Sequence, residues 1–144
     1  MAHILLAEDR TDVSSLMIEI LELEGYIVDW VPDGLAAIDK LHAAHQYDIL
    51  ITDMAMPERN GIEVIKHAQS LERKIPSIII SGGDIDPDHP ELANDMQNAA
   101  SPTVLDYTTT SIADCVLRKP IDFNILRRAI SILAAAPLSS KEAN

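Results

Sequence analysis

Basic and aromatic side chains are scarce in this chain of 144 residues. It has 11 Lys and Arg residues against 23 Asp and Glu residues, a formal net charge of −12, and an aromatic content of only 3%. A surface with this excess of negative charge repels nucleic acid and anionic lipid, and few rings are present to stack on bases. We therefore expect no direct contact with nucleic acid and none with a membrane.

Cysteine is nearly absent as well, and no apolar run is long. The one cysteine, Cys115, cannot form a disulfide within the chain, which suits a reducing compartment. No apolar run approaches the ~20 residues of a membrane-spanning helix, and no basic stretch precedes the first run, as it would in a secretory signal. We therefore predict a cytoplasmic protein. Apolar residues make up 47% of the chain, enough for one packed core.

Short apolar runs alternate with segments of helical periodicity. The runs are typical of strands buried on both faces, and they lie at residues 4–7, 27–31, 49–51, 78–80 and 115–117. Helical spacing or composition follows each run, at residues 13–21, 38–41, 61–71, 91–100 and 126–133. Asp33 and Asp122 are candidate N-caps. Five strand–helix repeats predict an α/β fold with a parallel sheet and helices on both faces.

Two segments depart from this regular alternation. Residues 82–114 are long for one loop–helix–loop connection, because a turn at 87–90 and the helix at 91–100 are followed by an irregular stretch. Residues 137–144 are polar and are predicted to be a C-terminal tail or the start of a linker. This leaves residues 1–136 as a single domain.

Polar residues follow four of the predicted strands. Glu8 and Asp9 follow the first, Asp53 the third, Ser81 the fourth and Lys119 the fifth. Because the carboxyl ends of parallel strands share one edge, we expect these side chains to converge. Carboxylates ~4 Å apart repel by roughly 4 kcal/mol at an effective dielectric near 20, unless a cation lies among them. Hard oxygen ligands indicate Mg²⁺, with Mn²⁺ as the alternative.

This set of residues suits the transfer of a phosphoryl group. A metal ion would offset charge on both the incoming group and Asp53, which could then attack phosphorus and become an aspartyl phosphate. Lys119 would pair with one phosphoryl oxygen, and the Ser81 hydroxyl would donate to another.

The motifs at residues 4–9, 53–57, 60–61, 81–83 and 119–120 together resemble the receiver domain of response regulators in two-component signalling, including the chemotaxis-regulator type. The resemblance covers about residues 3–134. It implies a flavodoxin-like, doubly wound fold. In that fold a five-stranded parallel sheet in the order 2-1-3-4-5 is flanked by five helices. Here the region between the fourth and fifth strands would be enlarged.

The resemblance also assigns the phosphoacceptor and the metal ligands. Asp53 matches the phosphoacceptor. Asp9 matches the direct Mg²⁺ ligand, and Glu8 matches a residue that usually acts through water. The carbonyl of Ala55 matches the backbone ligand. Ala55 also leaves little side chain beside the site, so we expect a short phosphoryl lifetime.

The remaining matches concern the switch. Ser81 and Lys119 match the switch hydroxyl and the phosphate-binding lysine, and the bond before Pro120 is expected to be cis. An aromatic residue usually stands where this chain has Val116, so we expect altered coupling to the surface, with Tyr107 a candidate substitute ring. The extra segment 84–110 lies where partners usually bind, which predicts unusual partner recognition.

The implied function is a signalling switch that catalyses only its own phosphorylation and dephosphorylation. A sensor histidine kinase or histidine phosphotransfer protein would supply the phosphoryl group. The surface of the fourth helix, fifth strand and fifth helix would then change for a protein target, an output domain or a second copy of the chain.

Three other functions remain open. A Mg²⁺-dependent phosphatase resembling D-x-D-x-[TV] would need an acid where Ala55 stands. A flavin carrier of the same topology would need aromatic partners, which are scarce, and a receiver fold could serve only as a scaffold. The five histidines show no ligand spacing, and His42 and His45 are expected to face solvent rather than bind metal.

Overall fold

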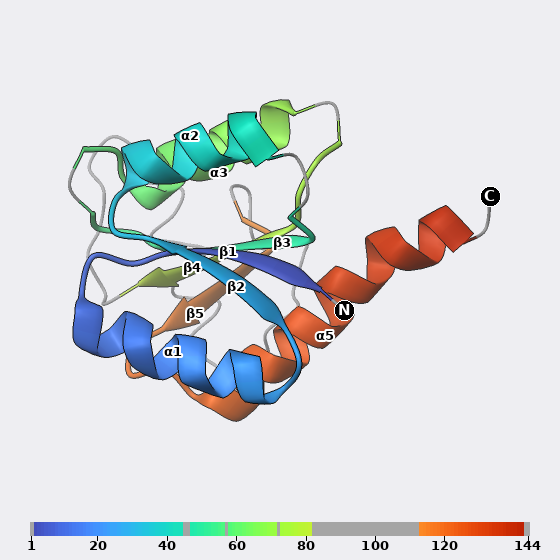
Figure 1. Ribbon diagram of the computed structural model, residues 1–144, viewed down its shortest axis with the longest axis horizontal. Helices are drawn as coiled ribbons and strands as arrows, with labels where there is room; N and C mark the ends of the chain where they lie inside the picture. The colour runs from blue at the N-terminus through green and yellow to red at the C-terminus, as the bar shows by residue number, and fades with distance from the viewer. Residues whose placement is uncertain (1, 45–46, 57, 72, 82–112, 143–144) are drawn as a thin grey trace.

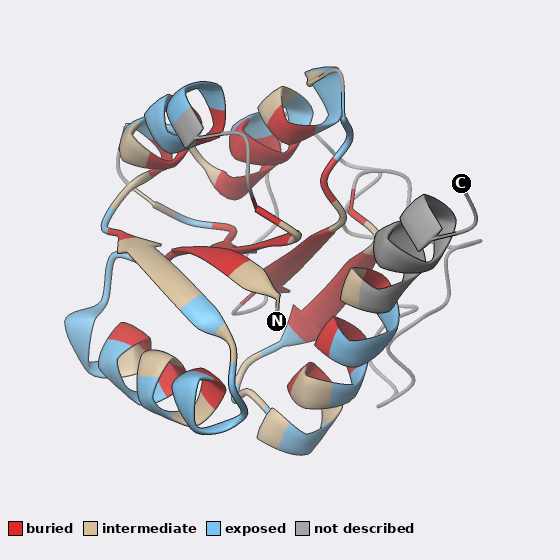
Figure 2. Ribbon diagram, turned by 45° about the vertical axis from the view of Figure 1, so that its right-hand side comes forward, coloured by how far each residue is buried: buried red, intermediate tan, exposed pale blue. Residues whose placement is uncertain are grey.

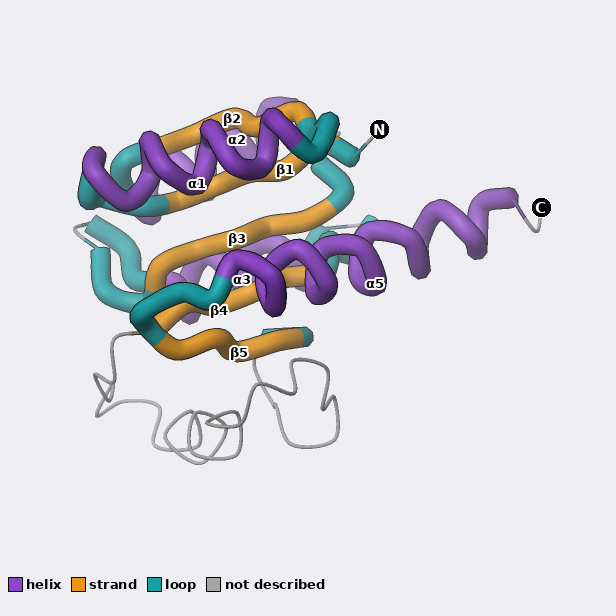
Figure 3. The backbone as a smooth tube through the Cα atoms, turned by 90° about the horizontal axis from the view of Figure 1, so that it is seen from below, coloured by secondary structure: helices purple, strands orange, loops and turns teal. Residues whose placement is uncertain are grey.

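The computed structural model describes residues 2–44, 47–56, 58–71, 73–81 and 113–142. Its centre is one sheet of five parallel strands, in the order β2-β1-β3-β4-β5 that the sequence predicts, as Figure 3 shows. The strands are β1 (His3–Ala7), β2 (Ile27–Val31), β3 (Ile49–Asp53), β4 (Ser77–Ser81) and β5 (Cys115–Arg118). Each contains the apolar run that predicted it, so the α/β class and strand order are confirmed.

Four helices lie within the described residues and cover both faces of the sheet (Figure 1). They are α1 (Thr11–Leu23), α2 (Gly34–Ala44), α3 (Gly61–Ser70) and α5 (Phe123–Glu142). The helix predicted at 91–100, the extra segment 84–110 and Tyr107 lie outside the described residues. Helix α5 extends across most of the segment predicted as a polar tail, so the boundary at residue 136 stays a prediction. No helix in the described ranges is long and apolar enough to cross a membrane.

The core has two halves because neighbouring residues of a strand point to opposite faces. In β1, Leu5 and Ala7 pack into the apolar cluster beneath α2 and α3, whereas Ile4 and Leu6 pack into the cluster beneath α1 and α5. Every residue of β3 and β4 is buried, and Figure 2 shows these central strands as continuously buried ribbons. Burial on both faces explains why the strands are unbroken apolar runs.

Side-chain caps fix where helices begin. The carboxylate of Asp33 accepts a hydrogen bond from the backbone N–H of Ala36 at 2.8 Å, and Asp122 accepts one from Asn124 at 2.9 Å. Both predicted caps are confirmed. These bonds satisfy N–H groups that a first helical turn leaves without partners.

A polar cluster stabilises the edge strand β2 at its one charged residue. The hydroxyl of Tyr47 donates to Asp29 at 2.7 Å, and Nε2 of His3 lies 3.1 Å from the same carboxylate. The rings of His3 and Tyr47 also meet edge to face, with centroids 4.8 Å apart. Asp29 therefore interrupts the apolar run without leaving a half-buried charge unpaired.

Candidate functional site

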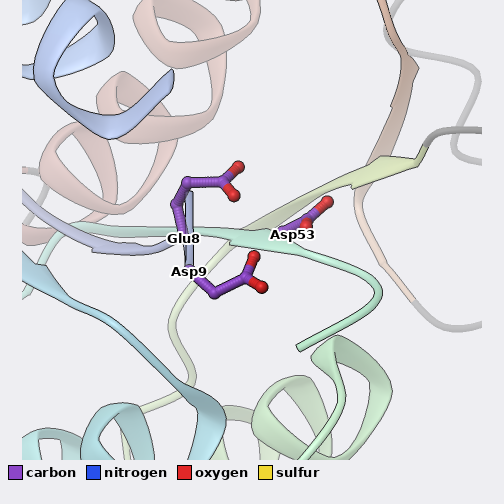
Figure 4. Close-up of side chains that lie close together, drawn as sticks. All are labelled: Glu8, Asp9 and Asp53. Carbon is purple, nitrogen blue, oxygen red and sulfur yellow. The ribbon is translucent and has the colours of Figure 1, made fainter. Parts of the chain in front are cut away.

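Three carboxylates converge at the carboxyl edge of the sheet. Asp53 is the last residue of β3, and Glu8 and Asp9 follow β1 directly. One carboxylate oxygen from each lies within 4.8 Å of the other two, and Figure 4 shows the three side chains gathered beside these strand ends. Glu8 and Asp53 are buried, whereas Asp9 is exposed. The convergence expected from sequence is therefore present for all three acids.

Lys119, which follows β5 at the same edge of the sheet, completes the cluster. Its Nζ lies 3.1 Å from Oδ1 of Asp53, and its backbone N–H donates to the carbonyl of Ser81 at 2.8 Å. The Lys119–Pro120 bond is cis, as expected. A single lysine thus offsets part of the negative charge of three carboxylates, and it contacts only one of them in the described ion pairs.

Burial and like charge disfavour the ionised carboxylates. Burial raises the pKa of Asp53, and Lys119 opposes that rise. Burial also raises the pKa of Glu8 to about 7; the backbone N–H of Arg10 opposes this rise, and the charge of Asp53 adds to it. A nearby cation would therefore lower the pKa of both carboxyl groups and favour their charged forms.

Among the described residues, one oxygen of Glu8 has no hydrogen-bond partner. Glu8 is only 1% exposed; its Oε2 accepts from the N–H of Arg10 at 3.1 Å, while Oε1 is buried and unpaired. An unpaired buried carboxylate oxygen is unfavourable unless another group supplies positive charge. Three carboxylates with one open oxygen fit a hard divalent cation that keeps part of its water shell, and Mg²⁺ has this preference.

A neighbouring strand holds the backbone of Glu8. The indole Nε1 of Trp30, on β2, donates to the carbonyl of Glu8 at 2.9 Å, and the backbone N–H of Glu8 donates to Val31 at 3.1 Å. Sequence reasoning missed Trp30 as part of the site. The available signal was the single tryptophan of the chain on a predicted strand, because a half-buried indole N–H needs an acceptor.

Close backbone contacts position Asp53. The N–H of Gly61, at the start of α3, donates to the carbonyl of Met54 at 2.9 Å, which folds the intervening loop back on the strand. A Cβ atom at Gly61 would lie only 2.4 Å from the carbonyl oxygen of Asp53. Ala55 lies in this loop and is exposed. Glycine at the first position of α3 therefore permits the close approach that fixes the strand end.

The predicted switch positions occupy the two strands beyond Asp53. Ser81, the last residue of β4, is fully buried, and β4 pairs with both β3 and β5. Val116 is 2% exposed and packs in the apolar cluster beneath α2 and α3, together with Ile79 of β4. At the position where related receiver domains usually have an aromatic side chain, this chain thus has a small apolar one that packs with Ile79.

The chain matches the response regulator receiver domain family over residues 4–131. Among curated relatives, it is 34% identical over 82 residues to the response regulator receiver protein CpdR of Brucella abortus; this match covers 57% of this chain and 68% of that protein. It is 36% identical over 88 residues to the transcriptional regulatory protein CpxR of Escherichia coli, covering 60% of this chain and 37% of CpxR. The chain thus matches little more than a third of the length of CpxR.

Solved receiver domains share the fold. A receiver domain of a Francisella response regulator superposes with a TM-score of 0.72 at 21% identity, covering 94% of this chain and 98% of that one. The response regulator TrrA of Thermotoga maritima, solved with Mg²⁺ and BeF, gives 0.68 at 23% identity, covering 92% and 99%. Three observations indicate the same family: the sheet order, the acidic edge and the family match over most of the chain. The chain belongs to the response regulator receiver domain family of two-component systems.

Proposed function

We propose that this chain is a phosphoacceptor switch in which Asp53 receives a phosphoryl group from a sensor histidine kinase or a histidine phosphotransfer protein. One observation carries the proposal: Asp53, 5% exposed at a strand end, lies 3.1 Å from the Lys119 ammonium and within 4.8 Å of two other carboxylates. Such a carboxylate is held in place, and its neighbours can offset the charge of a phosphoryl group.

Glu8, Asp9, Asp53 and the carbonyl of Ala55 are the groups that would hold Mg²⁺, or Mn²⁺ in its place. When bound, the ion supplies positive charge between the carboxylates and the phosphoryl oxygens. The unpaired oxygen of Glu8 and the raised pKa values of Glu8 and Asp53 support this assignment, because each reflects negative charge that the protein alone leaves incompletely balanced.

In the transfer step, a carboxylate oxygen of Asp53 attacks phosphorus in line with the bond to the donor imidazole. The new P–O bond forms as the P–N bond breaks, and the electron pair of that bond stays on the leaving nitrogen. Lys119 then pairs with a phosphoryl oxygen instead of Oδ1 of Asp53. The hydroxyl of Ser81, at the end of the next strand, donates to another.

The phosphoryl group adds about −1.5 to −2 charges and three strong acceptors at the sheet edge. Lys119 transmits this change, because its side chain contacts Asp53 and its backbone links β5 to the segment that starts α5. We assign the output to the surface of β5, α5 and the fourth-helix region, for a target protein, an output domain or a second copy. Val116 makes the coupling at this surface differ from one that uses an aromatic ring.

The chain catalyses only its own phosphorylation and dephosphorylation under this proposal. The phosphatase alternative lacks a second acid, because Ala55 stands two residues after Asp53. An assay for turnover of a small phosphate ester separates the two functions. Release of phosphate well beyond one equivalent per chain would favour the phosphatase, and the absence of flavin absorbance in purified protein would dismiss the flavin carrier.

The direct experiment incubates the chain with phosphoramidate or acetyl phosphate and Mg²⁺, and measures intact mass. We expect a gain of one phosphoryl group that hydroxylamine removes and that requires the divalent ion. Asp53→Asn should abolish the gain. Asp12→Asn is the matched control, because Asp12 is an exposed carboxylate on α1 that pairs only with Arg10 in the described ion pairs. Equal labelling of Asp53→Asn and the wild type would refute the assignment.

A further inference from the structure

Two histidines face each other across the interface between α2 and α3. Nε2 of His42, in the last turn of α2, lies 3.1 Å from Nδ1 of His67, in the second half of α3. The ring planes are perpendicular, with centroids 5.2 Å apart. The pair lies outside the acidic site, and neither residue has a role in the proposed phosphoryl transfer.

Buried apolar packing sets the distance between the two helices. Leu41 of α2 and Ile65 and Ala68 of α3 are fully buried in the same cluster, and the helices lie side by side in Figure 1. The imidazoles therefore meet at the edge of a packed interface rather than on two mobile segments. His42 is exposed and His67 is half-buried, so a small cation has access from solvent.

The spacing of the two nitrogens matches one tetrahedral metal ion. Zn²⁺ binds imidazole nitrogen at about 2.0–2.1 Å, so two nitrogens on one tetrahedral ion lie about 3.3 Å apart. The observed 3.1 Å is close to that value, and both rings would rotate about their side-chain bonds to aim their lone pairs at one point instead of at each other. From this geometry we infer that His42 and His67 form a Zn²⁺ site that clamps α2 to α3, with water in the remaining positions.

Local charge favours a cation there. Asp39 precedes His42 by three residues and Glu63 precedes His67 by four, and these spacings place the side chains on the same helix faces. Arg59 lies 3.5 Å from Glu63, in a pair exposed to solvent and therefore weak. Lys66 is adjacent to His67 in sequence, a spacing that directs the two side chains apart on a helix.

Metal binding would replace the hydrogen bond between the rings. In that bond, one neutral imidazole donates its N–H to the other. The donor ring must shift its proton to its other nitrogen before both facing nitrogens can coordinate, so two neutral rings release no net proton. Imidazole is a preferred ligand of Zn²⁺, whereas Mg²⁺ prefers oxygen, so the histidine pair and the acidic site should discriminate between these ions.

The test is calorimetric titration of the untagged chain with Zn²⁺ at neutral pH, in excess Mg²⁺, together with thermal unfolding. The wild type should bind one equivalent at the histidine pair and unfold at a higher temperature with Zn²⁺. His42→Gln and His67→Gln should each weaken this binding by more than about 100-fold, since loss of outer-shell partners alone costs roughly 10- to 100-fold. Each variant should keep its phosphorylation by acetyl phosphate, which shows that it is folded.

Two controls locate the ion. Asp53→Asn removes a carboxylate of the acidic site and should retain the Zn²⁺ equivalent, and His3→Gln removes a histidine at β1 and should retain it too. The inference is overturned if the wild type binds Zn²⁺ more weakly than about 1 mM. It is also overturned if either His42→Gln or His67→Gln binds as the wild type does, or if Asp53→Asn abolishes the binding.

Discussion

Replacing Gly61 with alanine should displace the phosphoacceptor without touching its chemistry. Gly61 is the first residue of α3 and lies against the backbone of Asp53. An alanine Cβ would stand 2.4 Å from the carbonyl oxygen of Asp53 and 3.1 Å from Cα of Met54. The clashing atoms belong to the main chain, so no side-chain rotation relieves them.

The magnitude follows from the required separation. Ordinary contact begins at 3.4 Å, so the Cβ and the carbonyl oxygen must move apart by about 1 Å (3.4 − 2.4). Overpacking of this kind typically lowers the free energy of unfolding by about 1–3 kcal/mol. A displacement of ~1 Å at a reacting group can lower the rate about 100-fold. We therefore expect Gly61→Ala to reduce stability moderately and phosphorylation severely.

The assay compares urea unfolding with the rate of labelling by acetyl phosphate in Mg²⁺. Gly25→Ala is the matched control, because Gly25 has a φ of 92° and no atom within 4 Å of an added Cβ. An alanine there is strained by roughly 1–3 kcal/mol, but it lies after α1 and meets nothing at the site. It should lose stability comparably and label at the wild-type rate. If Gly61→Ala labels as fast as Gly25→Ala, the close backbone contact does not position Asp53.

Three further substitutions probe the acidic site, the polar cluster around Asp29 on β2 and the N-cap of α3. Burial raises the pKa of Glu8 from 4.5 to about 7, so between pH 4.5 and 7 the folded chain keeps a proton that the unfolded chain releases. In metal-free buffer, the free energy of unfolding of the wild type should therefore fall by up to about 3 kcal/mol as the pH rises from 4.5 to 7. Glu8→Gln should flatten that pH profile in urea titrations, and an unchanged slope would contradict the assignment. Tyr47→Phe removes the 2.7 Å hydrogen bond to Asp29 and should lower the free energy of unfolding by about 1–2 kcal/mol. Because that bond holds the pKa of Asp29 below its usual range, the pKa of Asp29 should rise in an NMR titration of the variant. Asn60→Ala removes the cap on the N–H of Glu63 and should lower stability by about 1 kcal/mol in thermal unfolding; no change would show that water replaces the cap.

Sequence reasoning predicted the strands and the site because both depend on strong, local signals. Runs such as 78–80 are apolar throughout, since strand β4 is buried on both faces. Because parallel strands end at one edge of a sheet, the positions of Glu8, Asp9 and Asp53 after their strands predict that the three carboxylates meet. That rule does not give distances. The contact of Lys119 with Asp53, and its absence from the other described ion pairs, depends on side-chain rotamers.

Features formed between elements were not predictable in the same way. His42 was expected to face solvent without a metal role, and it is exposed, but its approach to His67 depends on how two helices cross. The unpaired oxygen of Glu8 depends on which backbone N–H groups lie beside it. The length of α5 also exceeds the apolar period from which it was predicted, because an apolar period marks only the part of a helix that packs against the core.

The hydrogen bond from Trp30 to the carbonyl of Glu8 gives the chain an internal optical probe. Trp30 is the only tryptophan of the sequence, so tryptophan emission comes from one place: the edge strand β2, whose indole is hydrogen-bonded to the backbone of Glu8. A change in charge or backbone position at residue 8 alters the electric field on that indole. Fluorescence of the unmodified protein should therefore follow ion binding and phosphoryl turnover in real time, without a dye or a label.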